Sequence, residues 1–274
     1  MKSQILSVLQ SAPVREGAKI LNRLLSRKRP HPVGIGSFVV YARTFDRILA
    51  LHLLKWKLNE RAEVDFFQRL IAPGMCVVDV GANLGYYTLL AAKRVGPNGR
   101  VFAFEPDPEN HSLLAQSIQA NGFNNVILSD KAVSDVSGRG TLFFSEEHRG
   151  DHRIFDPGDG RKRIEVSTVR LDDAIPEDVS IDVIKMDIQG AEMKAMEGTK
   201  RILDRNPQIK ILCEFWPMGL SLSGCSGEEF LSLFSARGFT YSYLGKQGQL
   251  RSATAEQLVQ MCGKTGYINL YIRI

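Results

Sequence analysis

Apolar and polar residues follow two periods along most of the chain. Short apolar runs, typical of buried strands, are separated by stretches in which apolar residues recur every three or four positions, as they do on one face of a helix. Regular alternation of this kind predicts an α/β fold with a doubly wound, mostly parallel sheet and helices on both of its faces. The predicted strands are 76–80, 101–105, 126–129, 181–186 and 209–215, and the predicted helices are 85–94, 108–121, 190–205 and 226–237.

Two regions depart from this alternation. Residues 131–171 contain two β-prone runs, 140–144 and 164–169, around a polar loop. A polar insertion of this length in a compact domain is usually functional or mobile, so we expect a β-rich insertion with such a role. Near the end of the chain, 239–244 and 267–274 are both strand-like without a clear helix between them, which predicts an antiparallel final strand.

The first 70 residues are predicted to form a basic N-terminal helical extension and linker, ahead of a main domain at 71–274. Apolar residues at helical spacing in 14–28 and in 46–70 indicate amphipathic helices. Two prolines and two glycines in 29–36 indicate a linker. We expect the extension either to pack on the main domain or to contact a membrane surface or a partner protein.

The positive charge of the chain is concentrated at its N-terminus. Residues 1–30 carry seven Lys or Arg and one acidic residue, a net charge of +6, whereas all 274 residues together carry +5. The rest of the chain is nearly neutral, so no nucleic-acid partner is expected, although residues 1–30 could touch an acidic membrane or partner surface. No apolar run in the sequence spans a bilayer or resembles a secretory signal, which predicts a cytoplasmic location.

Cysteine and histidine spacing gives no support for a metal site. The four cysteines stand far apart, without the close pairs that zinc sites usually show. Cys76 and Cys213 lie inside apolar runs, where a cysteine is most often a small buried hydrophobe. We therefore expect no metal and a reducing compartment.

The first strand of the alternating region leads into a glycine turn that reads VVDVGANLGYYT. A dinucleotide fingerprint would need glycine where Asn83 and Tyr86 stand, and the lysine of a phosphate-binding loop is absent. Asp79 at the strand end would also repel a polyphosphate. A cofactor with a cationic centre fits better, and Glu105 at the end of the next strand is spaced to bind ribose hydroxyls. These features favour S-adenosyl-L-methionine.

The sequence resembles the FkbM family of S-adenosylmethionine-dependent methyltransferases over about residues 34–240. The resemblance rests on the strings VVDVGANLGYYTLLAA, VFAFEPDPEN, NGFNNVILSDKAVSD, STVRLDD and IKMDIQGAEMKAMEG. It implies a class I, Rossmann-like fold with a seven-stranded, mostly parallel sheet. Gln189 departs from the family, which commonly has an acidic residue there. If that acid transfers protons elsewhere in the family, another residue must do so here.

The resemblance also implies where the cofactor lies. The glycine turn would line its methionine part, Glu105 its ribose, and Asp107 with the turn after the third strand its adenine. Asp107 could instead cap the helix that Pro108 opens, and the two roles are compatible. The expected cofactor-binding residues are Asp79, Gly81, Asn83, Gly85, Thr88, Glu105, Pro106, Asp107, Asp130, Ala132 and Asp187.

Four residues are candidates for removing a proton from an acceptor hydroxyl, a role that assists methyl transfer. Asp187 ends the fourth strand, where open α/β sheets bind ligands, but it could instead cap the next helix. Glu192 could be an ordinary first-turn acid. Glu214 follows a strongly apolar strand beside the expected pocket. His152, in the polar insertion, titrates near neutral pH when unperturbed, or is a solvated loop residue.

These observations predict an S-adenosylmethionine-dependent O-methyltransferase that acts on a hydroxyl of a sugar or small natural product. Two alternatives remain open. One is a nucleic-acid methyltransferase, which the neutral main domain and the string DIQG after the fourth strand disfavour. The other is a non-catalytic cofactor-binding or scaffold protein of the same fold, which Gln189 motivates. The sequence gives no indication of the oligomeric state.

Overall fold

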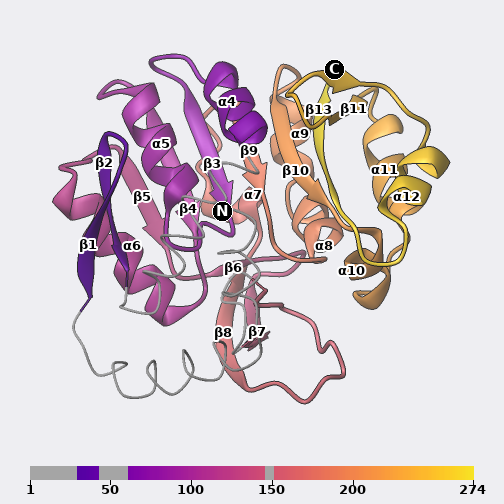
Figure 1. Ribbon diagram of the computed structural model, residues 1–274, viewed down its shortest axis with the longest axis horizontal. Helices are drawn as coiled ribbons and strands as arrows, with labels where there is room; N and C mark the ends of the chain where they lie inside the picture. Colours follow the sequence, from indigo (N-terminus) through magenta and orange to yellow (C-terminus); the bar gives the residue numbers. More distant parts are fainter. Residues whose placement is uncertain (1–29, 43–60, 146–150) are drawn as a thin grey trace, which may run out of the picture.

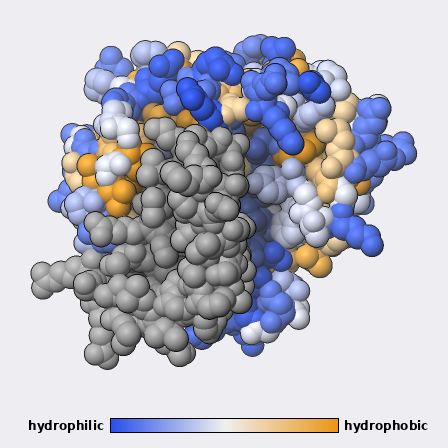
Figure 2. Space-filling view, viewed as in Figure 1, coloured by the Kyte–Doolittle hydropathy of each residue, from blue (hydrophilic) through white to orange (hydrophobic). Residues whose placement is uncertain are grey.

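The computed structural model describes residues 30–42, 61–145 and 151–274. Some predictions concern residues that lie wholly or mostly outside these ranges. They are the amphipathic helix at 14–28, the first part of the one at 46–70 and the basic residues 1–30. No helix in the described ranges has the length and apolar character required to cross a membrane. On the face seen in Figure 2, hydrophilic residues cover most of the described surface, and hydrophobic residues form small separate groups.

The described residues form one large sheet with the strand order β12-β11-β13-β10-β9-β3-β4-β5 (Figure 1). The five strands from β10 to β5 pair in parallel, and β13 pairs antiparallel with both β10 and β11. The predicted mostly parallel sheet with an antiparallel final strand is therefore confirmed, although the short β12 adds an eighth strand to the predicted seven. The strands are β3 (Cys76–Val80), β4 (Arg100–Phe104), β5 (Val126–Ser129), β9 (Val183–Met186), β10 (Lys210–Phe215), β11 (Thr240–Leu244), the two-residue β12 (Leu250–Arg251) and β13 (Ile268–Arg273).

Helices cover both faces of this sheet because its strands are apolar on both sides. Val77 of β3 packs in a cluster with Phe67 of α4 and Ala91 of α5, whereas its neighbour Val78 joins the cluster under α8, α9 and α11. The helices are α4 (Arg61–Leu70), α5 (Tyr86–Val95), α6 (Pro108–Ala120), α7 (Leu171–Ala174), α8 (Glu192–Glu197), α9 (Lys200–Arg205), α10 (Pro217–Leu222), α11 (Gly227–Ser235) and α12 (Ala255–Cys262).

The helices differ from the sequence prediction at two places. The single helix predicted at 190–205 is two short helices, α8 and α9, which are separated near Gly198. A Cβ at Gly198 would lie 2.1 Å from the carbonyl oxygen of Ser134, so the chain approaches its neighbour closely at this break. The segment between β11 and β13 contains α12, which begins with a capping box between Thr254 and Gln257 that the sequence analysis missed.

A β-hairpin occupies residues that were expected to be linker and helical extension. Strands β1 (His31–Ile35) and β2 (Phe38–Ala42) pair antiparallel around Gly36, whose φ of 62° suits a tight hairpin turn. Phe38 and Val40 pack on apolar residues of α5 and α6, because alternate residues of β2 face the main domain. The linker prediction for 29–36 is therefore wrong at 31–36, which form β1 and the start of the hairpin turn.

The insertion forms a second, small sheet with the order β6-β8-β7, at the end of the molecule toward which β3 and β4 point (Figure 1). Its strands are β6 (Ala132–Val133), β7 (Gly138–Phe143) and β8 (Arg163–Val169). β7 and β8, which contain the two predicted β-prone runs, pair antiparallel. The small sheet therefore stands beside the carboxyl ends of the parallel strands.

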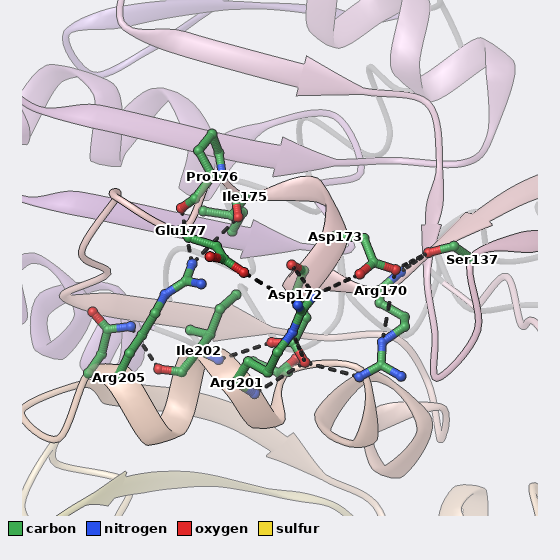
Figure 3. A network of polar contacts seen from close by, with 12 residues as sticks. Ser137, Arg170, Asp172, Asp173, Ile175, Pro176, Glu177, Arg201, Ile202 and Arg205 are labelled. Carbon is green, nitrogen blue, oxygen red and sulfur yellow. Dashed lines mark hydrogen bonds and ion pairs between the residues drawn. The ribbon is translucent and has the colours of Figure 1, made fainter.

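A buried carboxylate fixes the segment of the chain that leads from the small sheet back to the large sheet. Asp172, whose side chain is fully buried, accepts hydrogen bonds from the backbone nitrogen of Ile202 at 3.0 Å and from that of Arg201 at 3.2 Å (Figure 3). It also lies 3.1 Å from the guanidinium of Arg170. Asp172, in the family string STVRLDD, therefore has a structural role: it stabilises the N-terminal end of α9.

Candidate functional site

A pocket lies at the carboxyl ends of β3, β4 and β9, where ligands bind in open α/β sheets. Its empty space, open mouth included, is about 530 Å³. The order of the strands sets the order of the residues along the sheet edge: Asp187 follows β9, Gly81 follows β3, Glu105 follows β4 and Ala132 lies beyond β5. The insertion closes one end with Leu142 of β7 and with His152 and Ile154 of the segment between β7 and β8.

The glycine turn approaches the neighbouring strand end so closely that only glycine fits. Gly81 has a φ of 81°, and a Cβ there would lie 2.1 Å from the carbonyl oxygen of Asp187. Its backbone nitrogen and that of Ala82 both donate to the carbonyl oxygen of Phe104 at 3.0 Å. Asn83, with a φ of 52°, is one of two non-glycine residues with positive φ in the described ranges. Strained residues of this kind concentrate at functional sites.

Glu105 is held by two backbone groups at the base of the pocket. Its Oε2 accepts from the nitrogen of Asn83 at 2.7 Å, and its Oε1 accepts from the nitrogen of Asp107 at 2.9 Å. Burial raises the pKa of Glu105 to about 7, although both hydrogen bonds favour the ionised form. The carboxyl group is therefore preorganised and retains lone pairs for a hydroxyl-bearing ligand.

Asp79 and Thr88 lie behind the pocket wall rather than on it. The hydroxyl of Thr88 donates to Oδ2 of Asp79 at 2.5 Å, and both side chains are buried. Burial raises the pKa of Asp79 to about 6. The two residues fix the end of β3 against the start of α5, so they support the turn from behind.

Asp107 caps α6 and also contacts the insertion. Its Oδ1 accepts from the backbone nitrogens of Glu109 at 2.7 Å and Asn110 at 2.9 Å, which is the helix-capping role considered from the sequence. Its Oδ2 lies 3.1 Å from Nε2 of His152. Burial opposes ionisation, but the hydrogen bonds from His152 and Asn110 hold the pKa of Asp107 below its usual value.

Two carboxylates share one amide group at the other end of the pocket. Nε2 of Gln189 donates to Oδ1 of Asp187 at 2.7 Å and to Oε1 of Glu214 at 3.0 Å. Burial, together with the charge of Asp187, raises the pKa of Glu214 well above its usual value. The side chain of Asp187 is 37% exposed, so it is the accessible member of the pair. Trp216 lies just beyond, with the guanidinium of Arg153 4.7 Å above its ring.

Lys185 supplies a buried positive charge beneath this pair. Its Nζ lies 3.6 Å from Oε1 of Glu63 and 3.8 Å from Oδ2 of Asp187, with its side chain 3% exposed. Burial opposes its ionisation, but Glu63, Asp187 and Asp79 raise the pKa of Lys185 above its usual value. The sequence analysis did not select Lys185, although a lysine inside an apolar strand is itself a signal, because buried lysines are almost always paired.

Glu192 lies beneath the turn that follows β9 and does not line the pocket. Its Oε1 accepts from the nitrogens of Ile188 and Gly190, both at 3.2 Å. Burial raises the pKa of Glu192 to about 7. Its position matches a residue that stabilises a backbone turn.

The pocket brings together some of the predicted residues and leaves others aside. The predicted residues that line it are Gly81, Asn83, Glu105, Pro106, Ala132, His152 and Asp187. Gly85 packs against Leu114, where a Cβ would lie 2.1 Å away, and Asp130 is exposed to solvent. Asn110, Leu142 and Ile154 line the pocket but were not predicted. Their spacing in the sequence gives no sign that the insertion folds back over α6.

The residues present fit a nucleoside with an attached amino-acid part. Glu105 offers lone pairs for vicinal hydroxyls, and the turn at Gly81 leaves no side chain in the way. Oδ1 of Asn83 and Oδ1 of Asn110 are buried acceptors without a partner in the described part of the chain. Buried polar atoms seldom remain unpaired, so these two oxygens indicate a donor-bearing ligand. No group of three or more His, Cys, Asp or Glu in the described residues could hold a metal ion.

Comparison with known proteins gives a family match over most of the described domain. The family model described as "Methyltransferase FkbM domain" matches residues 79–241. The chain is similar to Methyltransferase sdnD of Sordaria araneosa, with 26% identity over 44% of this chain and 59% of that protein. It is similar to 2-O-methyltransferase NoeI of Sinorhizobium fredii, with 29% identity over 48% of this chain and 60% of that protein. The chain therefore covers less than two thirds of either relative.

Among solved structures, the chain is similar to TYW2 of M. jannaschii in complex with AdoMet. It is 16% identical, and the match covers 90% of this chain and 85% of that chain with a TM-score of 0.48.

Proposed function

Because this chain belongs to the FkbM family of methyltransferases, we propose that it methylates a hydroxyl group of a sugar or another small natural product. S-adenosylmethionine is the methyl donor, and when bound it supplies a methyl group already activated by a sulfonium centre. The similarity to a protein named as a 2-O-methyltransferase supports an oxygen acceptor. The observation that carries the proposal is the carboxyl group of Glu105, held by the nitrogens of Asn83 and Asp107 beside the turn at Gly81.

The donor is proposed to lie along the sheet edge with its ribose hydroxyls on Glu105. The methionine part then lies on the turn of Gly81 and Asn83, toward β9, and the adenine lies toward β5. This direction follows from the chemistry, because the reacting end must face the acidic side chains that receive the acceptor. Asp79 and Thr88 keep the turn in place from behind.

Asp187 is proposed as the base that takes the acceptor proton. Of the two carboxyl groups joined by Gln189, Glu214 is buried and has a pKa well above its usual value, whereas Asp187 is more exposed and lies 3.8 Å from Nζ of Lys185. Gln189 orients both groups through its amide, so the role of the acid common in the family falls to Asp187.

Calorimetry with S-adenosylmethionine tests cofactor binding. The intact protein should bind it with micromolar affinity. Glu105→Ala should weaken binding by a factor of ten or more, because a hydrogen bond to a charged group is worth about 1.5–3 kcal/mol. Glu228→Ala, exposed in the first turn of α11, serves as the control that keeps the affinity. A folded protein that does not bind the donor contradicts the proposal.

Methyl transfer from a labelled donor to a panel of acceptors tests the reaction. The panel contains sugars, polyhydroxylated natural products and RNA, and mass spectrometry locates the new methyl group. Methylation of a hydroxyl that is lost in Asp187→Asn supports the proposal. Methylation of RNA alone would contradict the acceptor class, and donor binding without any product would favour a scaffold. The cytoplasmic location and the contact of residues 1–30 with a membrane or partner stay predictions.

A further inference from the structure

The polar groups expected to recognise the adenine are not free to do so. Both oxygens of Asp107 are engaged, Oδ1 by the start of α6 and Oδ2 by His152. Asp130 is exposed and does not line the pocket. If the proposed function holds, a different group must meet the exocyclic amino group of the base.

Asn110 is the residue whose geometry fits this task. It stands in the first turn of α6, is 1% exposed and lines the pocket on the side of β4 away from Asp187. Its Oδ1 is buried and accepts no hydrogen bond within the described residues. A carbonyl oxygen is an acceptor only, so its missing partner is a donor, and the exocyclic amino group of adenine is the donor that such a ligand brings there.

The insertion completes this end of the pocket with apolar side chains. Leu142 comes from β7 and Ile154 from the segment that pairs with β7 through the bridge between Phe143 and Arg153. Val133 of β6 lines the same end and is 3% exposed. An apolar wall with a single polar group that fixes orientation is the usual design of a site for a flat heterocycle.

We propose that Asn110 Oδ1 accepts the hydrogen bond of the exocyclic amino group of the cofactor's adenine, and that Leu142 and Ile154 form the wall over that base. This inference rests on the proposed function, because it assumes the same donor in the same pocket. It assigns the insertion to cofactor recognition at this end, in addition to any contact with the acceptor.

The test compares two ligands that differ only at the amino group. S-adenosylhomocysteine and S-inosylhomocysteine, in which oxygen replaces the amino group, are titrated into the full chain by calorimetry. The wild type should bind the adenosyl compound at least tenfold more tightly, because the inosyl compound leaves Asn110 Oδ1 unpaired in a buried site. Asn110→Ala should reduce this ratio to near one. Gln119→Ala, exposed on the same helix, should keep the wild-type ratio.

A second pair of measurements tests the wall. S-adenosylhomocysteine with a benzyl group on its exocyclic nitrogen should bind the wild type at least tenfold more weakly than the parent compound. Ile154→Ala should recover most of that loss, because it removes side-chain volume over the base, whereas Glu105→Ala should weaken both ligands equally. A change in selectivity between ligands separates these roles from a general structural effect.

Each outcome has one meaning. A tenfold preference that persists in Asn110→Ala overturns the assignment of Asn110, and an unchanged loss for the benzyl ligand in Ile154→Ala overturns the assignment of the wall. If Asn110→Ala does not fold, Asn110→Ser, which is polar but too short to reach the base, replaces it. A wild type that binds neither nucleoside contradicts the proposed function itself, whereas tight binding without Asn110-dependent selectivity contradicts only this inference.

Discussion

Nε2 of His152 lies 3.1 Å from Oδ2 of Asp107, and the two side chains are only 10% and 6% exposed. The other ring nitrogen, Nδ1, accepts a hydrogen bond from the backbone nitrogen of Ser145 at 3.1 Å. His152 therefore joins the insertion to the cap of α6, and both of its nitrogens are occupied in this arrangement. The solvated histidine considered from the sequence does not describe this residue.

Removing the imidazole should loosen the insertion. In His152→Ala, Asp107 loses a buried partner, and we expect a loss of about 1–2 kcal/mol in the free energy of unfolding. Amide hydrogen exchange should become faster at Arg153, whose nitrogen donates to Phe143 across the small sheet. His111→Ala on α6 is the matched control. Unchanged exchange at Arg153 would show that the contact with Asp107 does not hold the segment.

Adding one methyl group to the glycine turn should remove cofactor binding. Gly81→Ala places a Cβ 2.1 Å from the carbonyl oxygen of Asp187, so the end of β3 must separate from the end of β9. Gly74→Ala has a similar φ, 84° against 81°, but nothing lies within 4 Å of its Cβ. We expect Gly74→Ala to cost about 1–2 kcal/mol from backbone strain and to bind the donor normally. Chemical denaturation and calorimetry on both variants measure the difference, and equal effects would contradict the steric argument.

The stability of the ligand-free protein should fall as the pH rises from about 4.5 to 7. The pKa of Glu192 is raised from 4.5 to about 7 by burial, so the folded chain holds a proton that the unfolded chain releases across this window. Glu192→Gln cannot titrate, and the fall should shrink by about 1–3 kcal/mol, since one pKa unit corresponds to about 1.4 kcal/mol.

Urea unfolding at pH 5 and pH 8 measures this effect. Glu105 and Asp79 shift in the same direction, so part of the pH dependence should remain in Glu192→Gln. Glu228→Gln, exposed in the first turn of α11, should behave as the wild type does. A full wild-type pH dependence in Glu192→Gln would mean that this carboxyl group ionises normally in the folded state.

Lys185 should contribute to the free energy of unfolding because its buried charge compensates the acidic side chains around it. Lys185→Met leaves Glu63 and Asp187 without their shared cation, and removal of one partner of a buried pair typically costs about 3–5 kcal/mol. Adding Glu63→Gln removes one uncompensated charge and should restore part of the loss. Thermal and urea unfolding of the single and double variants measure this coupling. Purely additive losses would argue against an electrostatic role.

The sequence predicts the part of the fold that is set by local pattern. The strand at 126–129 is found at those residues, and the glycine turn is found between β3 and α5 because its chemistry is contained in neighbouring residues. Glu105 could likewise be chosen, since the end of β4 must lie beside the end of β3. The local pattern does not predict which distant segments of the chain contact one another. The pairing of His152 with Asp107 and of Lys185 with Glu63 depends on how the insertion and α4 pack.

The hairpin and the break between α8 and α9 were missed for a related reason. The run at 29–36 contains two prolines and two glycines, which indicate a linker, but alternate apolar residues of the adjoining β2 pack on α5 and α6. The helical break near Gly198 follows from the approach of Ser134, which lies 64 residues earlier in the chain. Tertiary contacts therefore outweigh local propensity at these places.

At the C-terminal end of α6, the side chain of Asn121 forms the pair of hydrogen bonds to β2 that a neighbouring strand would form. Its Oδ1 accepts from the nitrogen of Val39 at 2.9 Å, and its Nδ2 donates to the carbonyl oxygen of the same residue at 2.6 Å. These two hydrogen bonds attach the β1–β2 hairpin to the helix whose opposite end carries Asp107 and Asn110. A ligand that binds Asn110 therefore contacts a helix that is fixed at both ends, so substitutions in the hairpin should change the affinity for the nucleoside.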